Sequence, residues 1–334
     1  MSGSANDNAF SSWPDKKSIQ ATSPWPIIRK QITKNVKNDT NTDKRHYILA
    51  AYIDQAEFFY KSTIHADNLA SKSLLLYYFA LNLVKAYIIF KDPSVKYLNG
   101  FSHGLLDNYR TQGETYDIEK AELKFEKPDN HTIRTFDYFA KTIGSPTYGQ
   151  KLPIKDLLKQ IVIGHRLWAS SRPNREEHFI RVVSFQIDRP QSISVHTNSK
   201  INRDIDKVFT GKIKSSATKY QNNRIDISIT EEKDASKFDI KKFIWPVVTT
   251  ESPFRAYYLA TTKLESHLNP LVSCYALMFH LGSIARYKPF LFNDIIESDD
   301  SAQIVEFLNC IPSQFLYLLS SEIIERDIER PAIL

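Results

Sequence analysis

A stretch in the middle of the chain carries many residues that could contact a nucleic acid. Between positions 165 and 181 lie two histidines, four arginines and one tryptophan, against two acidic side chains: His165, Arg166, Trp168, Arg172, Arg175, Glu176, Glu177, His178 and Arg181. Guanidinium groups bind phosphates, and an aromatic ring can stack on a base. The stretch therefore fits a surface whose arginines bind RNA phosphates while Trp168 stacks on a base. A solvated loop with local arginine–glutamate pairs is the alternative.

A second group of candidates surrounds the nearly all-apolar segment from Leu74 to Phe90. Asn82 and Lys85 lie three residues apart in this segment and share one helix face, and His103 follows in the next loop. In one interpretation His103 is catalytic and faces a groove together with Lys85, which binds RNA. In the other, His103 only caps a helix or binds a backbone carbonyl. In such apolar surroundings Lys85 must extend its amine outward or pair with a carboxylate, the candidates being Asp54, Glu57 and Asp107.

Arg286 lies at the end of the apolar helix expected over residues 270–286. It could bind RNA, or it could interact with the carbonyl end of the helix dipole. The sequence has no P-loop, no dinucleotide-binding glycine pattern, no Gly-x-Ser-x-Gly and no metal-spaced carboxylates. Cys274 and Cys310 do not form a zinc-binding pattern. We therefore expect neither a metal ion nor a cofactor.

The composition is that of a globular protein that can accept a polyanionic partner. Of the 334 residues, 42% are hydrophobic and 25% are charged, which is enough apolar material for a core. The formal net charge of +6 permits RNA as a partner without requiring it. The first residues lack the basic and apolar segments of a secretory signal, so we expect a cytoplasmic protein.

Hydrophobic spacing predicts most of the helices. The segment from Leu74 to Phe90 is short for a membrane span and has a lysine near its middle. We therefore expect the central buried helix of a bundle, and no membrane contact. Helical spacing also recurs over residues 47–62, 152–168, 254–266, 270–286 and 301–327. Between these, FIRVVSFQI, SISVH and RIDISI alternate with period two, which predicts a small antiparallel sheet.

The expected fold class is mainly α (α+β): a helical bundle built from N- and C-terminal helices, with an inserted small antiparallel β-sheet segment. We expect a flexible N-terminal arm over residues 1–44, the N-terminal part of the bundle over 45–177, the β-containing insertion over 178–250, and the C-terminal helices over 251–334. Trp-Pro pairs interrupt the polar arm at Trp13 and Trp25. Backbone before a proline is biased to extended geometry, so each tryptophan could hold the arm against the folded body. A partner-binding peptide is the alternative.

Two blocks of the sequence resemble the bacterial YaaC-like family: LLLYYFALNLVKAYIIF with the HGL that follows it, and LNPLVSCYALMFHLGSIARYKPF. The resemblance spans roughly residues 45–320 and implies a fold and a bacterial cytoplasmic origin more than an activity. A wider resemblance is to HEPN domains, whose helix–loop pattern is similar to that of Tyr77, Tyr78, Lys85, Ala86 and His103. It implies a helical bundle, commonly dimeric. Many such domains are metal-independent ribonucleases of toxin–antitoxin and anti-phage systems, and others are RNA-binding or scaffolding modules.

The HEPN resemblance implies an active site in which an arginine precedes a histidine by a short spacer. The histidine transfers the proton of a ribose 2′-hydroxyl, and the arginine stabilises the charge of the phosphorane. Arg172 and His178 have a suitable spacing, as do Arg189 and His196. With 15 arginines and nine histidines in the chain, chance alone gives about one such pair. Arg172 also precedes a proline in an expected loop, whereas the family places this arginine in a helix.

Two functions remain open at this point. The first is an RNA-directed protein of antiviral defence or stress response, with Arg172, His178 and His103 as catalytic residues if it is a ribonuclease. The second is a non-catalytic module that forms a homodimer or binds a protein partner. The geometry separates them, because an enzyme needs one arginine and one histidine that converge in a basic groove.

Overall fold

A computed structural model describes residues 13, 16–36, 42–95, 100–109, 111–112, 115–127, 132–145, 147, 149, 151–171, 178–188, 192–197, 216–221, 224–229, 244–252, 254–260 and 267–332. Arg172, Arg175 and Arg189 lie outside these described residues.

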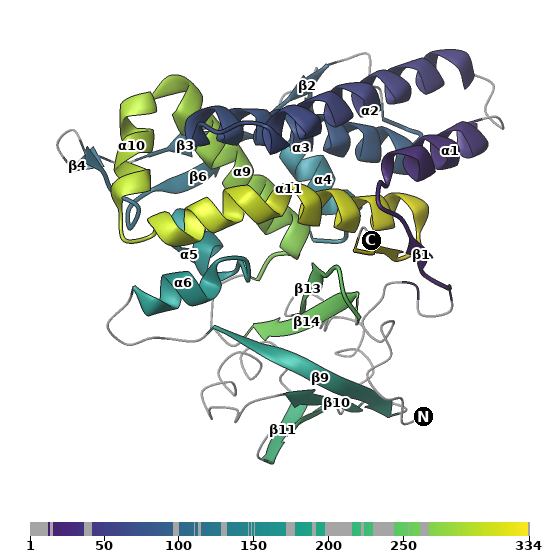
Figure 1. The fold of residues 1–334 in the computed structure, drawn as a ribbon, viewed down its shortest axis with the longest axis vertical. Coiled ribbons are helices and arrows are strands. Elements are labelled where there is room, and N and C mark those ends of the chain that lie inside the picture. Colours follow the sequence, from purple (N-terminus) through teal and green to yellow (C-terminus); the bar gives the residue numbers. More distant parts are fainter. Residues whose placement is uncertain are drawn as a thin grey trace.

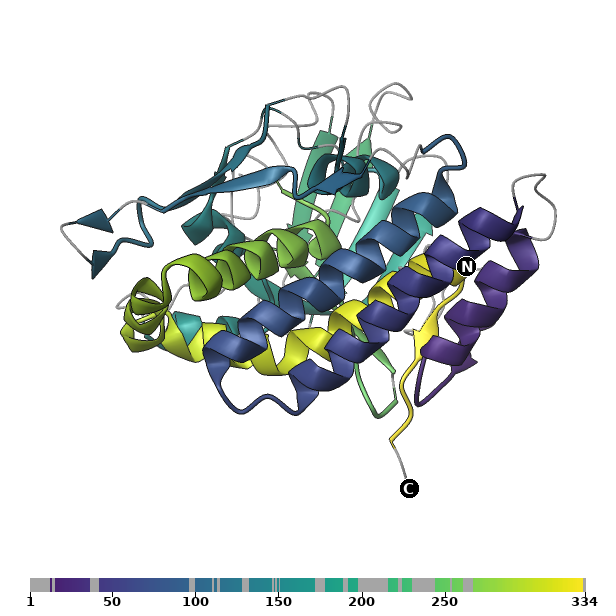
Figure 2. The ribbon, with the colours of Figure 1, turned by 90° about the horizontal axis from the view of Figure 1, so that it is seen from above.

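The central element is helix α3 (Leu69–Lys91). It packs against four other helices: α2 (Thr42–Ile64), α4 (Thr135–Thr142), α9 (Pro270–Tyr287) and α11 (Ser301–Ile324). The side chain of Asn68 caps its first turn by accepting a hydrogen bond from the backbone N–H of Ser71 (3.0 Å). The helix is long and apolar enough to cross a membrane, but most of its apolar segment is buried among the other helices (Figure 2). The prediction of a central buried helix is confirmed.

Helices α3 and α9 approach each other closely at Gly282. A Cβ atom added to Gly282 would lie 2.8 Å from the Cβ of Tyr77, nearer than side chains tolerate. The missing side chain of Gly282 therefore leaves room for Tyr77 between the two helices. Helix α9 begins at a capping residue, Asn269, whose side chain accepts a hydrogen bond from the N–H of Leu271 (2.9 Å).

Part of the segment predicted to be a flexible arm is folded. Residues Trp25–Val36 form helix α1, and β1 (Ile19–Gln20) pairs in parallel with β15 (Ile328–Glu329) near the C-terminus. Trp25 is buried and packs edge-on against the rings of Tyr60 and Phe79. The arm prediction is therefore wrong over these elements, because a few apolar side chains in a polar segment suffice to bury one face of a short helix.

A six-stranded antiparallel sheet lies on one side of the helices (Figure 1). The strand order is β11-β12-β10-β9-β14-β13, with β9 (Phe179–Asp188), β10 (Ser192–Thr197), β11 (Ser216–Gln221), β12 (Arg224–Ile229), β13 (Ile244–Val248) and β14 (Arg255–Ala260). The predicted sheet and the mainly α (α+β) fold class are confirmed. Strand β14 occupies part of the helix expected over residues 254–266. Six residues are too few for periodicity to separate helix from strand, and pairing with β9 decides for the strand.

Short elements connect the long helices. Strand β2 (Phe101–Ser102) pairs with β7 (Ile133–Arg134); β3 (Leu105–Asn108), β6 (Glu122–Phe125) and β8 (Leu152–Pro153) form a small sheet; β4 (Thr111–Gln112) and β5 (Thr115–Tyr116) form a hairpin; α10 (Pro289–Glu297) follows α9. The single helix expected over residues 152–168 is instead β8, α5 (Ile154–Lys159) and α6 (His165–Ser170). The chain turns at Gly164, which has a φ of +73° and where a Cβ would lie 2.8 Å from the backbone oxygen of Gln303.

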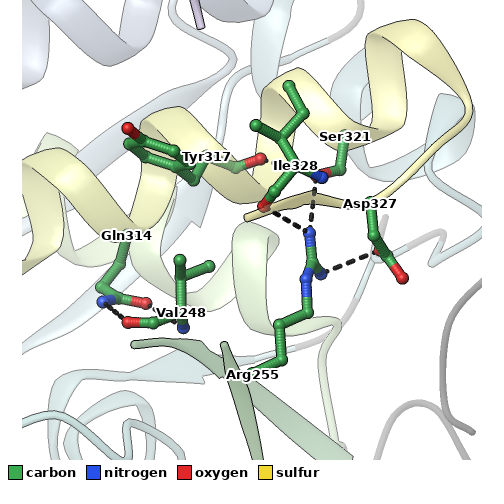
Figure 3. Close-up of polar contacts among 7 residues, drawn as sticks. All are labelled: Val248, Arg255, Gln314, Tyr317, Ser321, Asp327 and Ile328. Atoms are coloured by element: carbon green, nitrogen blue, oxygen red, sulfur yellow. Dashed lines mark hydrogen bonds and ion pairs between the residues drawn. The ribbon is translucent and has the colours of Figure 1, made fainter. Parts of the chain in front are cut away.

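The sheet is attached to helix α11 by polar contacts, some half-buried and some buried (Figure 3). The side-chain amide of Gln314 accepts a hydrogen bond from the N–H of Val248 (2.8 Å) and donates one to its carbonyl (2.7 Å). The guanidinium of Arg255 donates to Ser321 Oγ (2.7 Å) and lies 3.1 Å from a carboxylate oxygen of Asp327. The side chains of Arg255 and Asp327 are only 6% and 4% exposed, so this ion pair is almost fully withdrawn from water.

Candidate functional site

His103 lies in the loop between β2 and β3, against helices α3 and α9. Its Nδ1 is 2.5 Å from the hydroxyl oxygen of Tyr77, and its ring packs against Phe279. The next residue, Gly104, has a φ of +81°, and a Cβ there would lie 3.1 Å from the backbone nitrogen of Phe136. The glycine therefore allows the loop to approach α4, which holds His103 half-buried at the surface of the bundle.

Arg286 projects from the last turn of α9 toward α3. Its Nη1 donates a hydrogen bond to the hydroxyl of Tyr78 (2.6 Å), and its guanidinium lies over the ring of Tyr287, 5.0 Å from the centroid. The Tyr78 ring in turn stacks on Phe59 of α2. Arg286 is exposed, so it can meet a ligand from solvent.

Lys85 lies on the same helix as the two tyrosines. Its ammonium lies over the rings of Tyr52 and Phe101, 5.4 and 5.5 Å from their centroids. Burial lowers the pKa of the Lys85 amine. Within the part of the chain that the structure describes, no carboxylate forms an ion pair with it.

The carboxylates predicted as partners of Lys85 are used elsewhere. Asp54 and Glu57 bind Arg29 of α1, each with a shortest contact of 2.6 Å, and Asp107 binds His280. The predicted neighbour Asn82 is buried and donates to the Tyr78 carbonyl (2.8 Å).

The charges around His103 favour a neutral imidazole. Burial lowers the pKa of His103; the positive charges of Lys85 and Arg286 lower it further, while the carboxylate of Glu126 opposes them. Glu126 is held by a hydrogen bond from the Ser102 hydroxyl (2.5 Å). A neutral imidazole can accept a proton, and the two cations beside it can bind an anion. We call Tyr77, Tyr78, Lys85, His103, Glu126 and Arg286 the His103 cluster.

The Arg/His-rich stretch from the sequence is not one surface. Arg166 and Arg181 are exposed, on α6 and β9 respectively, whereas Trp168 is 6% exposed and His178 only 5%. Base stacking by Trp168 and catalysis by His178 therefore do not agree with the structure. Both rings pack into an aromatic core group with His165, where the backbone N–H of His178 donates to Nε2 of His165 (2.8 Å). His196 lies within strand β10, paired with β9 and β12.

This buried histidine pair predicts a specific acid sensitivity. Burial lowers the pKa of His165 to about 3 and that of His178 to about 4, whereas an unfolded histidine titrates near 6.5. Between the folded and the unfolded pKa values, the unfolded chain binds more protons than the folded protein. The free energy of unfolding is therefore highest above pH 6.5 and falls as the pH decreases toward 4. From pH 7 to pH 5 we expect a loss of about 2 kcal/mol for each histidine.

Urea unfolding of His178→Phe at pH 7 and pH 5 tests this expectation. The variant keeps an aromatic ring in the core and should lose about 2 kcal/mol less than the wild type over this range. His65→Ala, which removes an exposed histidine directly after α2, should retain the full dependence. Equal pH dependence in His178→Phe and the wild type would show that His178 does not remain neutral in the fold.

A buried hydrogen-bonded group was not found by sequence analysis. Nδ1 of His280 lies 2.6 Å from Asp107 Oδ1, and Nε2 lies 2.7 Å from the Tyr116 hydroxyl. His280 is 1% exposed in the middle of α9, and the three residues join α9, β3 and β5. From the sequence, a histidine on a helix that is apolar all round indicates that its ring must have hydrogen-bond partners, but it does not identify them.

Among the described residues, no three His, Cys, Asp or Glu side chains are grouped so that they could hold a metal ion. In comparisons with known proteins, the model of a family described as YaaC-like Protein matches residues 15–323. No curated protein and no solved structure matches this chain.

Proposed function

This chain belongs to the YaaC-like family, and from that premise we propose that it acts on RNA as a metal-independent endoribonuclease with a HEPN-like helical core. The His103 cluster is the proposed active site. A role in bacterial antiviral defence or stress response, in the cytoplasm, belongs to the same proposal. The observation that carries it is that His103 and Arg286 contact the consecutive residues Tyr77 and Tyr78 of α3, the helix that also carries Lys85.

The proposed chemistry uses the neutral imidazole as a base. His103 takes the proton of a ribose 2′-hydroxyl, and the 2′-oxygen attacks the adjacent phosphorus. The bond from phosphorus to the 5′-oxygen breaks, this oxygen takes up a proton, and the products are a 2′,3′-cyclic phosphate and a 5′-hydroxyl. Arg286 and Lys85 stabilise the negative charge that develops on the phosphate oxygens.

The proposed site differs from the arginine–histidine spacing that the HEPN resemblance implied. His178 is buried in the aromatic core group, so it cannot reach a ribose. The structure instead supports His103 as the base and Arg286, far along the chain, as the arginine. Of the positions of the resemblance, Tyr77 and His103 are in contact, and Lys85 lies on the same helix as Tyr77.

Arg286→Ala is expected to weaken RNA binding by about tenfold, because it removes one charge-assisted hydrogen bond to phosphate. The slope of the logarithm of the binding constant against the logarithm of the salt concentration should also decrease by about one. Gel retardation and denaturing gels of total bacterial RNA, incubated with the protein in EDTA, measure both binding and cleavage. Lys30→Ala on α1 removes another exposed cation and should leave both unchanged. Intact RNA without retardation at low salt would overturn the proposed function.

Exposed aromatic rings favour the protein-interaction module as a second candidate. Phe58 of α2 and Tyr287 of α9 are 65% and 60% exposed, on either side of the Tyr78–Arg286 contact. Large exposed rings are typical of protein contact surfaces. Sedimentation of the same samples separates the candidates: a stable dimer that neither binds nor cleaves RNA supports the interaction module.

A further inference from the structure

Two consecutive tyrosines of α3 each bind one of the two groups that the proposed reaction needs. Tyr77 contacts His103 Nδ1 at 2.5 Å, and Tyr78 accepts a hydrogen bond from Arg286 Nη1 at 2.6 Å. His103 comes from a loop and Arg286 from the end of another helix, so neither is held by its own element alone. The helix that carries both tyrosines is the central helix of the bundle, with 13 of its 23 residues buried, and gives them a rigid support.

We propose that Tyr77 and Tyr78 are positioning residues of the active site: Tyr77 sets the tautomer and orientation of His103, and Tyr78 holds Arg286 beside it. This inference rests on the proposed function for its catalytic meaning. The hydrogen bonds themselves exist without RNA, so they can be measured separately.

The packing explains why neighbouring residues can bind different groups. Successive residues of a helix project about 100° apart. Tyr77 is 5% exposed and points into the space left by Gly282, where its ring also contacts Tyr275 and Phe279. Tyr78 is half-buried and points to the rim, where it stacks on Phe59. One hydroxyl therefore lies inside the bundle and the other at its surface.

Tyr77 remains a neutral phenol in its buried surroundings. Burial, followed by the neighbouring hydroxyl of Tyr275, raises the pKa of Tyr77 well above its ordinary value, so the phenol stays protonated. For Nε2 to act as the base, Nδ1 must carry the ring proton and donate it to the Tyr77 oxygen 2.5 Å away. The Nε2 lone pair then remains for the substrate, which is the form that a general base requires. The charged groups that act on this ring are Glu126, Lys85 and Arg286.

NMR of the RNA-free protein tests the role of Tyr77. Imidazole nitrogen shifts should show His103 protonated at Nδ1 at neutral pH. In Tyr77→Phe the ratio of Nδ1–H to Nε2–H tautomers should fall by about tenfold, the value of one hydrogen bond of roughly 1.4 kcal/mol. Tyr87→Phe is the matched control, because it removes another buried hydroxyl of α3 whose ring instead contacts Phe139. An Nε2–H tautomer in the wild type, or an unchanged ratio in Tyr77→Phe, would overturn this role.

The role of Tyr78 has its own measurement. In Tyr78→Phe the Arg286 side chain should become mobile in ¹⁵N relaxation of its Nε–H group, while the His103 tautomer stays as in the wild type. Unchanged Arg286 mobility would overturn this role.

In the cleavage assay the two variants should differ. Tyr77→Phe should lower kcat by about tenfold, because it depletes the base form of His103. Tyr78→Phe should mainly raise KM, by about three- to tenfold. The NMR results stand even if the protein does not cleave RNA, so failure of the proposed function and failure of this inference remain distinguishable.

Discussion

Asp327→Ala is expected to lower the free energy of unfolding by about 3–5 kcal/mol, because it leaves the buried charge of Arg255 without its partner. The Arg255 guanidinium would still donate to Ser321 and to the Ile328 carbonyl, but no negative charge would remain beside it. The contact joins strand β14 to the segment that follows α11 (Figure 3), so its loss should loosen the sheet from the helices. Urea unfolding monitored by circular dichroism measures the change.

Two further variants separate this effect from a general loss of charge. The double variant Arg255→Met, Asp327→Leu removes both charges and should be more stable than Asp327→Ala alone, because apolar side chains can fill the site. Lys120→Ala breaks a surface ion pair with Asp117 (2.7 Å) and should leave the free energy of unfolding nearly unchanged. A loss below about 1 kcal/mol in Asp327→Ala would mean that the pair does not hold the sheet to the bundle.

His103→Ala is expected to lower the rate of RNA cleavage by at least about 10²-fold, because general-base catalysis contributes this much or more. Burial and two neighbouring cations lower the pKa of His103 below the ordinary value of 6.5. The base form therefore predominates at pH 7, and the wild-type rate should hold as the pH decreases past 6.5. The rate should fall only when the pH drops through the lowered pKa of His103. Initial rates in EDTA between pH 5 and pH 8 measure this profile.

The matched control for His103 is His65→Ala, an exposed position directly after α2, which should cleave RNA at the wild-type rate. Circular dichroism of both variants checks that the helices remain folded. A cleavage rate for His103→Ala within threefold of the wild-type rate would exclude His103 as the base.

The main helices were predictable because their apolar spacing extends over many residues. The segment from Leu74 to Phe90 combines high hydrophobicity with an internal lysine, and this combination is typical of a core helix. Short segments were less predictable. The run at residues 254–260 fits helix and strand alike until β9 pairs with it, and α5 and α6 are separate because Gly164 must turn beside Gln303.

Sequence analysis named every residue of the His103 cluster except Glu126, but not their arrangement. Lys85, His103 and Arg286 each stood out as a polar group beside an apolar element. Tyr78 and Arg286 are 208 residues apart in the chain, and no local pattern predicts that α3 and α9 cross there. The spacing of Arg172 and His178 was a poor guide, because local spacing does not report whether a ring lies inside or outside the core.

The sequence by itself determined which segments bury apolar surface, since hydrophobic periodicity reflects the geometry of a single element. It therefore determined the central helix, the antiparallel sheet and the mainly α class. Only the tertiary structure decided which polar side chains meet: Lys85 with two aromatic rings, Asp107 with His280, Tyr77 with His103. Such partners come from elements distant in the chain, and packing at contacts such as Gly282 brings them within hydrogen-bonding distance. The candidate site therefore arises from helix packing, because its residues come from separate segments of the sequence.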